Sequence, residues 1–490
     1  MRITQLRSLL VLTLGLCAAP ASAQSFRVQC PESTALHPNG STVDPTHPGL
    51  VKCQHIGGGD GYATMGDGTQ IYLFAFSPLS GLADLQSGLP GTQTASAFNQ
   101  GYIGPNYASG APPSGVATPN NGAITEPAGI MDMGVLAGNA PAPLMAIDED
   151  DELFLTLSNP GMIMRPDLFE QHTVHFHGYP NASSYFDGVP DASVAINIAG
   201  SFTYYYTAPD AGTYFWHCHI TPPEHLQMGM VGQLYVRPRQ NRLGPGADLR
   251  AALVAANQKA AVDPGATGLT CTDILCTGQT PAPSAMVAPV PRAAASVKYA
   301  YNDGDGSTAY DVEYPIQMMG FDPNFHYVGM TFNPEAFSDM KDKYPLLNGR
   351  GYPDTVNPGA ITTISADGVA RPSQPLPALI TIKKSAGQTR ALLRLSMLSV
   401  TEHVTLATVG VPMKVIAQNA RLLRDMAGGD LTYLTNSITM GGGESTDVIL
   451  DVTDPRYLPG QTYYLYSTNL DHLSNDAENF GGMMTEIRIL

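Results

Sequence analysis

Between residues 170 and 230 the chain concentrates side chains that can bind a metal. Half of its 12 histidines fall in this stretch. Cys218 is flanked directly by His217 and His219, and Met230 follows it. The other histidines of the stretch are His172, His175, His177 and His225. Imidazole, thiolate and thioether groups are ligands for soft and borderline transition metals, so this pattern predicts a metal site.

Strand geometry would sort these side chains into two groups. Neighbouring residues on a strand point to opposite faces, so His175 and His177 should share a face. His217 and His219 should likewise share one, with Cys218 on the other. A thiolate with two imidazoles and a weak thioether suits copper that cycles between two oxidation states. Zinc is the alternative metal, although a thioether is a poor zinc ligand. Ordinary hydrogen-bonded histidines are the remaining alternative.

The N-terminal segment indicates the compartment in which the cysteines lie. A positive start, an apolar stretch and a small-residue cleavage site predict a signal peptide over residues 1–23, and hence a periplasmic or extracellular protein. In an oxidising compartment, Cys30 with Cys53 and Cys271 with Cys276 can each close a local disulfide. Cys17 leaves with the signal peptide, so Cys218 is the odd cysteine of the remaining five, which favours a role as a metal ligand.

Composition excludes several classes of partner. The formal net charge of -17 disfavours nucleic acid and anionic membrane surfaces, which both repel an acidic protein. No segment after the signal is long and apolar enough to span a bilayer. Hydrophobic residues make up 43% of the chain and charged residues 14%, which is ample for packed cores.

Short strands must position the metal-binding residues. The 50 glycines and 40 prolines favour many turns. Strand patterns are found at residues 70–76, 153–157, 173–177, 202–207, 232–236, 379–382, 411–416 and 462–466. We expect a leader over 24–60, a copper-binding domain over 61–237 with a long loop insertion at 77–140, a linker over 238–297 and a copper-free domain over 298–490. The acidic run at 148–152 is expected to be a solvated strand edge.

The stretch from His172 to Val236 resembles the multicopper oxidases, including laccases, and more distantly the copper nitrite reductases. The motifs that carry the resemblance are His175-Phe176-His177-Gly178, Asp187-Gly188-Val189-Pro190, Trp216-His217-Cys218-His219 and Met228-Gly229-Met230. Residues 298–490 more weakly resemble the family's non-catalytic cupredoxin domains, through Asn348-Gly349-Arg350, Arg394-Leu395-Ser396 and Val415-Ile416-Ala417. The resemblance implies an all-β chain of two cupredoxin-like Greek-key β-sandwich domains.

The resemblance also implies roles for individual residues. The positions that match the type 1 copper ligands are His172, Cys218, His225 and Met230. The positions that match half of the eight histidines around a type 2/type 3 copper cluster are His175, His177, His217 and His219.

Two features depart from the family pattern. Five residues, ending in Glu224, separate the His-Cys-His run from His225, where the family usually has three. We expect Glu224 to lie near an exposed edge of His225. In the second domain the positions of the missing histidines hold Val404, Ala407, Val409 and Val411. We therefore expect that domain to bind no copper.

By resemblance, the chain is a laccase-like multicopper oxidase. Its reductant would be a small molecule or a metal ion, and its electron acceptor would be dioxygen. The alternatives are a blue-copper electron-transfer or copper-binding protein and a copper nitrite reductase. Because one chain carries only half of the cluster histidines, an oxidase is expected to be a homo-oligomer in which two first domains face each other.

Overall fold

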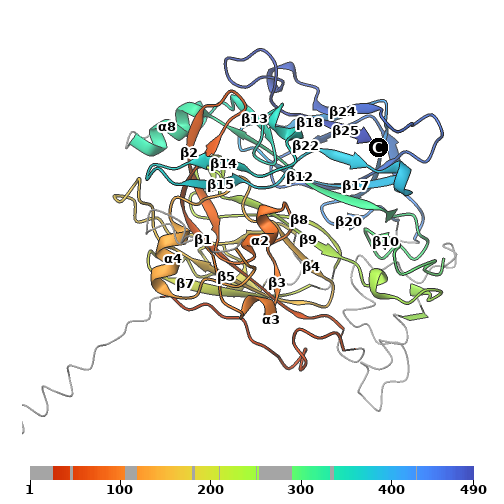
Figure 1. Cartoon of the computed structure of the whole chain (residues 1–490), viewed down its shortest axis with the longest axis horizontal. Helices are drawn as coiled ribbons and strands as arrows, with labels where there is room; N and C mark the ends of the chain where they lie inside the picture. Colours follow the sequence, from red (N-terminus) through yellow and green to blue (C-terminus); the bar gives the residue numbers. More distant parts are fainter. Residues whose placement is uncertain are drawn as a thin grey trace, which may run out of the picture.

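The computed structural model describes residues 26–44, 48–104, 119–178, 183–208, 210–249, 251–252, 290–331, 336–425 and 428–490. The expected signal peptide and the pair Cys271 with Cys276 lie outside these residues. The chain forms two β-rich lobes that pack against each other, drawn in red to green and in teal to blue in Figure 1. We call strands β1 to β9 the first lobe and strands β10 to β25 the second lobe.

The first lobe contains two sheets. One has the order β2-β1-β5-β7, with β3 paired to β1, and the other has the order β4-β9-β8-β6. The strands are β1 (Val51–Thr64), β2 (Gln70–Pro78), β3 (Gln93–Thr94), β4 (Met145–Asp148), β5 (Glu152–Ser158), β6 (His175–Phe176), β7 (Ser201–Thr207), β8 (Gly212–His217) and β9 (Val231–Arg237). The lobe also carries the helices α2 (Leu82–Gln86), α3 (Ala95–Phe98), α4 (Pro127–Gly134) and α5 (Pro222–Gln227).

The second lobe contains two larger sheets and two hairpins. The sheets have the orders β13-β12-β17-β23-β19-β20, with β21 paired to β19, and β16-β25-β24-β18-β22. Their strands are β12 (Val312–Phe321), β13 (Tyr344–Leu347), β16 (Ile380–Ile382), β17 (Arg390–Leu398), β18 (Val404–Val409), β19 (Met413–Gln418), β20 (Arg421–Leu422), β21 (Tyr433–Thr435), β22 (Ser437–Met440), β23 (Ser445–Asp451), β24 (Thr462–Ser467) and β25 (Met484–Ile489). The hairpins pair β10 (Lys298–Tyr299) with β11 (Ala309–Tyr310) and β14 (Ile361–Ile364) with β15 (Ala370–Gln374), and α8 (Pro323–Thr331) follows β12.

The two lobes repeat one pattern of strand pairing. β1 pairs in parallel with β5 and antiparallel with β2, and β12 pairs in the same senses with β17 and β13. In the other sheet, β9 pairs in parallel with β4 and antiparallel with β8, as β25 does with β16 and β24. β6 against β8 corresponds to β18 against β24. The expected all-β class of two sandwiches is confirmed.

Alternating apolar side chains explain why these segments are strands. In β7, Tyr204 and Tyr206 point into the core, while the residues that alternate with them, Thr203, Tyr205 and Thr207, are less buried. The core of the first lobe joins them to Leu155, Leu157 and Trp216. Every predicted strand segment falls on a strand of the structure. The described part of the 77–140 insertion carries α2, α3 and α4 and forms a small apolar core of its own.

The expected leader contributes a strand to the first lobe. β1 begins at Val51, within the segment expected to be irregular, and lies at the centre of its sheet. Its run Gly57-Gly58-Gly59 hides the strand pattern, since glycine disfavours strands unless another group approaches closely. Here the approaching group is the ring of His172, which packs against Gly58. The expected disulfide between Cys30 and Cys53 is present and ties the preceding segment to β1.

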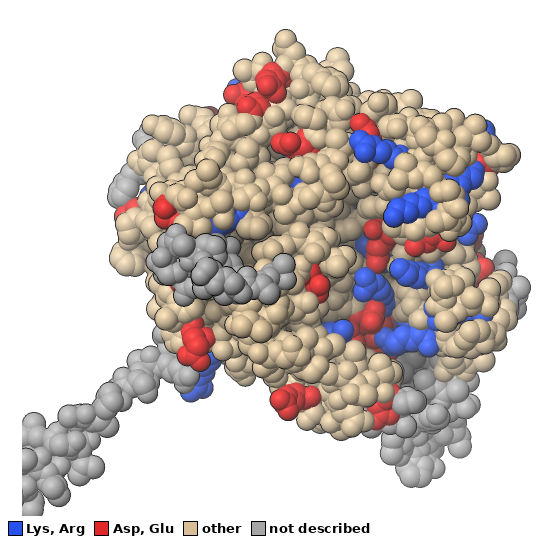
Figure 2. Space-filling model, in the orientation of Figure 1, with Lys and Arg blue, Asp and Glu red and all other residues tan. Residues whose placement is uncertain are grey.

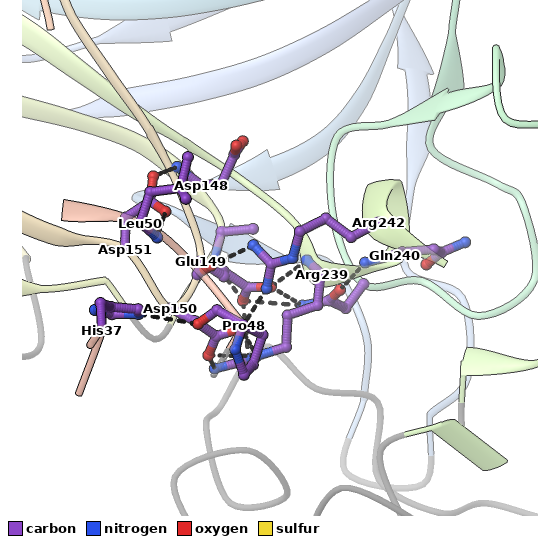
Figure 3. A network of polar contacts seen from close by, with 12 residues as sticks. His37, Pro48, Leu50, Asp148, Glu149, Asp150, Asp151, Arg239, Gln240 and Arg242 are labelled. Carbon is purple, nitrogen blue, oxygen red and sulfur yellow. Dashed lines mark hydrogen bonds and ion pairs between the residues drawn. The ribbon is translucent and has the colours of Figure 1, made fainter. Parts of the chain in front are cut away.

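Three of the five residues of the acidic run are buried, which corrects the expectation of a solvated edge. Glu149, Asp151 and Glu152 are at most 3% exposed. Figure 3 shows Arg239 and Arg242 directed at Glu149 and Asp150, where Arg239 Nη2 lies 2.7 Å from an Asp150 oxygen. On the face shown in Figure 2, Lys and Arg gather toward one side, and Asp and Glu are interspersed among them. A buried carboxylate needs partners, and these are supplied by residues distant in sequence.

Candidate metal centre

Strand register brings the two histidine motifs together. β6 and β8 pair antiparallel, with His175 opposite His217 and Phe176 opposite Trp216. Cys218 follows β8 directly, and its side chain points into the core of the first lobe, where Trp216 also lies. As the alternation predicted, the histidines beside Cys218 point the other way. Two groups of metal-binding side chains therefore lie on opposite faces of one sheet.

The inner group is fully buried. His172, Cys218 and His225 are each 0% exposed, and their ligand atoms lie within 4.8 Å of one another. Both histidines turn Nδ1 toward the sulfur, at 3.2 Å for His225 and 3.9 Å for His172. The backbone N–H of Thr173 donates to Cys218 Sγ at 3.4 Å. Three of the four expected type 1 ligands thus converge on one point.

A short helix delivers the fourth expected ligand. The segment between Cys218 and Met230 folds into α5, which has prolines in its first turn, where they are well tolerated. The N–H of Met230 donates to the His225 carbonyl at 2.9 Å, and the N–H of Cys218 donates to the Met230 carbonyl at 3.2 Å. Met230 is itself fully buried. The longer connection therefore still returns His225 to the sulfur, and it ties the backbone of Met230 to that of Cys218.

The electrostatics of the inner group fit a metal-bound thiolate. Burial alone would raise the pKa of Cys218, but the facing imidazoles of His225 and His172 hold it well below the usual thiol value. Nε2 of His172 is buried, and it has no hydrogen-bond partner among the described residues. A thiolate, two imidazoles that present Nδ1 and a nearby thioether form the donor set that copper uses in electron transfer. The residues present therefore fit copper.

Glu170, not Glu224, makes the ion pair with His225. Its Oε2 lies 3.4 Å from His225 Nε2, and this interaction lowers the pKa of Glu170. Glu224 is half-buried on α5, and burial raises its pKa. His225 has no exposed edge, so the expectation for Glu224 is corrected. Glu170 precedes the histidine motif in a loop, and no local sequence signal points to it.

Burial favours the uncharged form of two imidazoles in the outer group. Ligand atoms of His175, His177 and His217 lie within 4.8 Å of one another, and the Nε2 atoms of His177 and His217 are 3.0 Å apart. The ring of His219 lies 5.1 Å from that of His175. Burial lowers the pKa of His217 to about 3 and also lowers that of His177. All four expected histidines are therefore brought together, and the buried ones are in the form that binds metals.

Backbone carbonyls orient these rings. Nδ1 of His175 lies 2.7 Å from the carbonyl oxygen of Asp187, and Nδ1 of His217 lies 2.7 Å from that of Cys218. His177 hydrogen-bonds to the backbone of Gly443, which belongs to the second lobe. A proton held at Nδ1 leaves the Nε2 lone pair free for a metal ion. The second lobe thus helps to orient one of the outer histidines.

The second lobe supplies no histidine at the corresponding strand. Ala407 on β18 faces Tyr466 on β24, as His175 faces His217. Val404 and Val411 are buried among apolar side chains. That the second domain binds no copper stays a prediction.

Comparisons with known proteins agree with this site. Residues 122–241 match the family model described as multicopper oxidase. A multicopper oxidase of Talaromyces pinophilus is 34% identical over 112 residues, which are 22% of this chain and 17% of that protein. A laccase of Aspergillus fumigatus is 32% identical over 110 residues, again 22% of this chain and 17% of the relative. The matched region thus spans about a sixth of these relatives.

Among solved structures, the blue copper oxidase from Nitrosomonas europaea matches with a TM-score of 0.49 and 18% identity over 89% of this chain and 85% of that one. No helix in the described part of the chain is long and apolar enough to cross a membrane. The sequence match covers β4 to β9 and includes every expected copper ligand. Over residues 122–241 the chain is therefore similar in sequence to multicopper oxidases, including laccases.

Proposed function

We propose that this protein is a copper-dependent oxidase that takes electrons from a reductant at the inner site and delivers them to dioxygen at the outer site. The proposal rests on a covalent connection between the two sites. Cys218 of the inner group is bonded through the main chain to His217 and His219 of the outer group. Copper would supply one-electron transfer at the inner site and reduction of dioxygen to water at the outer site.

The chain's own residues prepare both sites. His172, Cys218, His225 and Met230 would hold the inner ion. Complete burial of the first three excludes water from the sulfur, and the Thr173 N–H stabilises its negative charge. His175, His177, His217 and His219 would hold copper at the outer site. The carbonyls of Asp187 and Cys218 keep the protons of His175 and His217 on Nδ1, so Nε2 of each ring stays available to a metal ion.

Oligomerisation completes the proposal. In the family the cluster takes four histidines from each of two domains, and here the second domain offers none at the corresponding positions. Two copies of the first lobe, related by a two-fold axis, would supply eight. The pair would then hold about five coppers, two at inner sites and three between the chains.

A blue-copper electron carrier is the second candidate, because one chain holds only one of the two histidine sets. A copper nitrite reductase is the third, and its single catalytic copper would leave some of the outer histidines unused. Copper analysis combined with sedimentation separates the three. About one copper per chain indicates a carrier, about two a nitrite-reductase-like arrangement, and between two and three the shared cluster.

Activity completes the test. The copper-loaded protein should consume dioxygen with a phenol or ferrous ion as the reductant. His219→Gln, which removes one of the outer histidines, should abolish this consumption of dioxygen. The matched control, His403→Gln, alters an exposed histidine outside both groups and should not. A strictly monomeric protein that reduces dioxygen to water without a partner would refute the shared cluster.

We further infer export to an oxidising compartment. The disulfide between Cys30 and Cys53 supports this, since such bonds persist where thiols are not kept reduced.

A further inference from the structure

The second lobe repeats the backbone bonds of the inner copper site. Ser467 stands at the end of β24 as Cys218 stands at the end of β8, and its N–H donates to the Met483 carbonyl at 2.9 Å. The N–H of Met483 donates to the His472 carbonyl at 2.8 Å. In the first lobe the same two bonds run from Cys218 to Met230 and from Met230 to His225.

The side chains repeat as well. His472 Nδ1 lies 2.8 Å from Ser467 Oγ, as Nδ1 of His225 faces the sulfur of Cys218. His472 Nε2 lies 2.9 Å from a Glu402 oxygen, as Nε2 of His225 lies against Glu170. Glu402 stands two residues before Val404, and Glu170 stands two residues before His172.

Only two of the four ligand positions differ in chemistry. Serine replaces the cysteine and valine replaces the first histidine, whereas His472 and Met483 match His225 and Met230. Val404, His472 and Met483 line one small cavity of about 10 Å³, together with Glu402. The ligand positions of the second lobe therefore still surround a common point.

The Ser467–His472–Glu402 chain also resembles a hydrolytic triad. Ser467 is 0% exposed, and the adjoining cavity of about 10 Å³ is no larger than one water molecule. A substrate cannot reach the hydroxyl group, so a nucleophilic role is excluded. The hydrogen-bond chain instead occupies the position that a metal ion and its thiolate would take.

We propose that the second lobe contains a latent type 1 copper site that lacks two side chains, a thiolate at position 467 and an imidazole at position 404. This inference rests on the copper assignment of the first lobe. Ser467→Cys places sulfur where the hydroxyl group already meets His472 Nδ1. Val404→His supplies a second imidazole from the wall of the same cavity, and Met483 is already in place.

The test uses a Cys218→Ser background, in which the native blue colour is absent. Cupric sulfate is added to this protein and to the variant that also carries Ser467→Cys and Val404→His. The variant should bind one more copper per chain than the background and should regain an intense visible charge-transfer band. The matched control places the thiol on neighbouring β22, as Ser437→Cys in the same background, and should give no such band.

Circular dichroism establishes whether each variant is folded. If the variant with both replacements does not fold, the inference is tested with Ser467→Cys alone in the same background. This replacement exchanges a single oxygen atom for sulfur. It should bind copper more weakly and still show the band. A folded protein with Ser467→Cys that shows no band, or an equal band in the Ser437→Cys control, would overturn the inference. A wild-type protein that is not blue would instead refute the function proposed above.

Discussion

Replacing Gly58 with alanine should disturb the inner copper site from a strand that supplies no ligand. Gly58 lies in β1 with ordinary strand geometry, opposite Phe76. A Cβ at this position would lie 2.7 Å from Cδ2 and 2.9 Å from Cγ of His172. Carbon atoms in comfortable contact are about 3.5–4 Å apart, so the ring must retreat by about 1 Å. His172 is fully buried, so its ring cannot move aside into solvent.

Overpacking of this kind costs typically about 1–3 kcal/mol. Denaturant unfolding of the copper-free protein should show this loss for Gly58→Ala, and the copper-loaded protein should show a shifted and weakened visible band. The matched control is Gly244→Ala, because a Cβ at Gly244 meets no atom within 4 Å. If Gly58→Ala matched the control in stability and the wild type in spectrum, the close packing of His172 on β1 would be refuted.

Three further predictions concern other contacts. Glu170→Gln removes an anion beside His225, so it should lower kcat/KM for cationic reductants about threefold more than for neutral ones and raise the reduction potential of the blue site. Glu224→Gln should produce smaller changes in both quantities. Equal changes in the two variants would contradict the role of Glu170. Gly443→Ala should lower the copper content of the outer site but leave the blue band, since the new Cβ would lie 2.6 Å from His177 Nδ1. Gly460→Ala, which has a similar positive φ and open space around its Cβ, is the control for metal analysis. Burial would raise the pKa of Glu313, but Arg394 and Arg237 hold it at about 2, below the ordinary 4.5. The ionised carboxylate therefore stabilises the fold by about 3 kcal/mol above about pH 4.5, and this stabilisation is lost as the pH falls toward 2. Urea unfolding across this range should show the loss in the wild type and not in Glu313→Gln.

Local sequence patterns predicted much of the copper centre. The ligands around Cys218 lie on two short strands and one connection, so alternation and spacing were sufficient to separate the inner group from the outer one. Such inferences succeed because each depends on residues that are close in sequence.

The remaining features depend on contacts between distant segments. β1 was missed because its glycines are explained only by the ring of His172, more than a hundred residues away. Burial of the acidic run depends on Arg239 and Arg242, and the position of Glu170 depends on how α5 returns His225 to the sulfur. None of these contacts leaves a periodic trace in the sequence.

The correspondence between the two lobes was only partly visible in the sequence. In the sequence, Tyr466-Ser467-Thr468 stands in the place of the His-Cys-His run, but the connection between His472 and Met483 is longer than that between His225 and Met230. Repeated backbone bonds identify the match where spacing does not.

We propose that the Cys218 thiolate holds a blue copper. The most direct measurement compares the visible spectrum and copper content of the wild type with those of Cys218→Ser, with circular dichroism to establish folding. The wild type should be intensely blue, and the folded variant should lose the band because no thiolate remains to donate charge to cupric ion. A Cys218→Ser protein that remains blue, or a colourless wild type that is loaded with cupric ion, would contradict it.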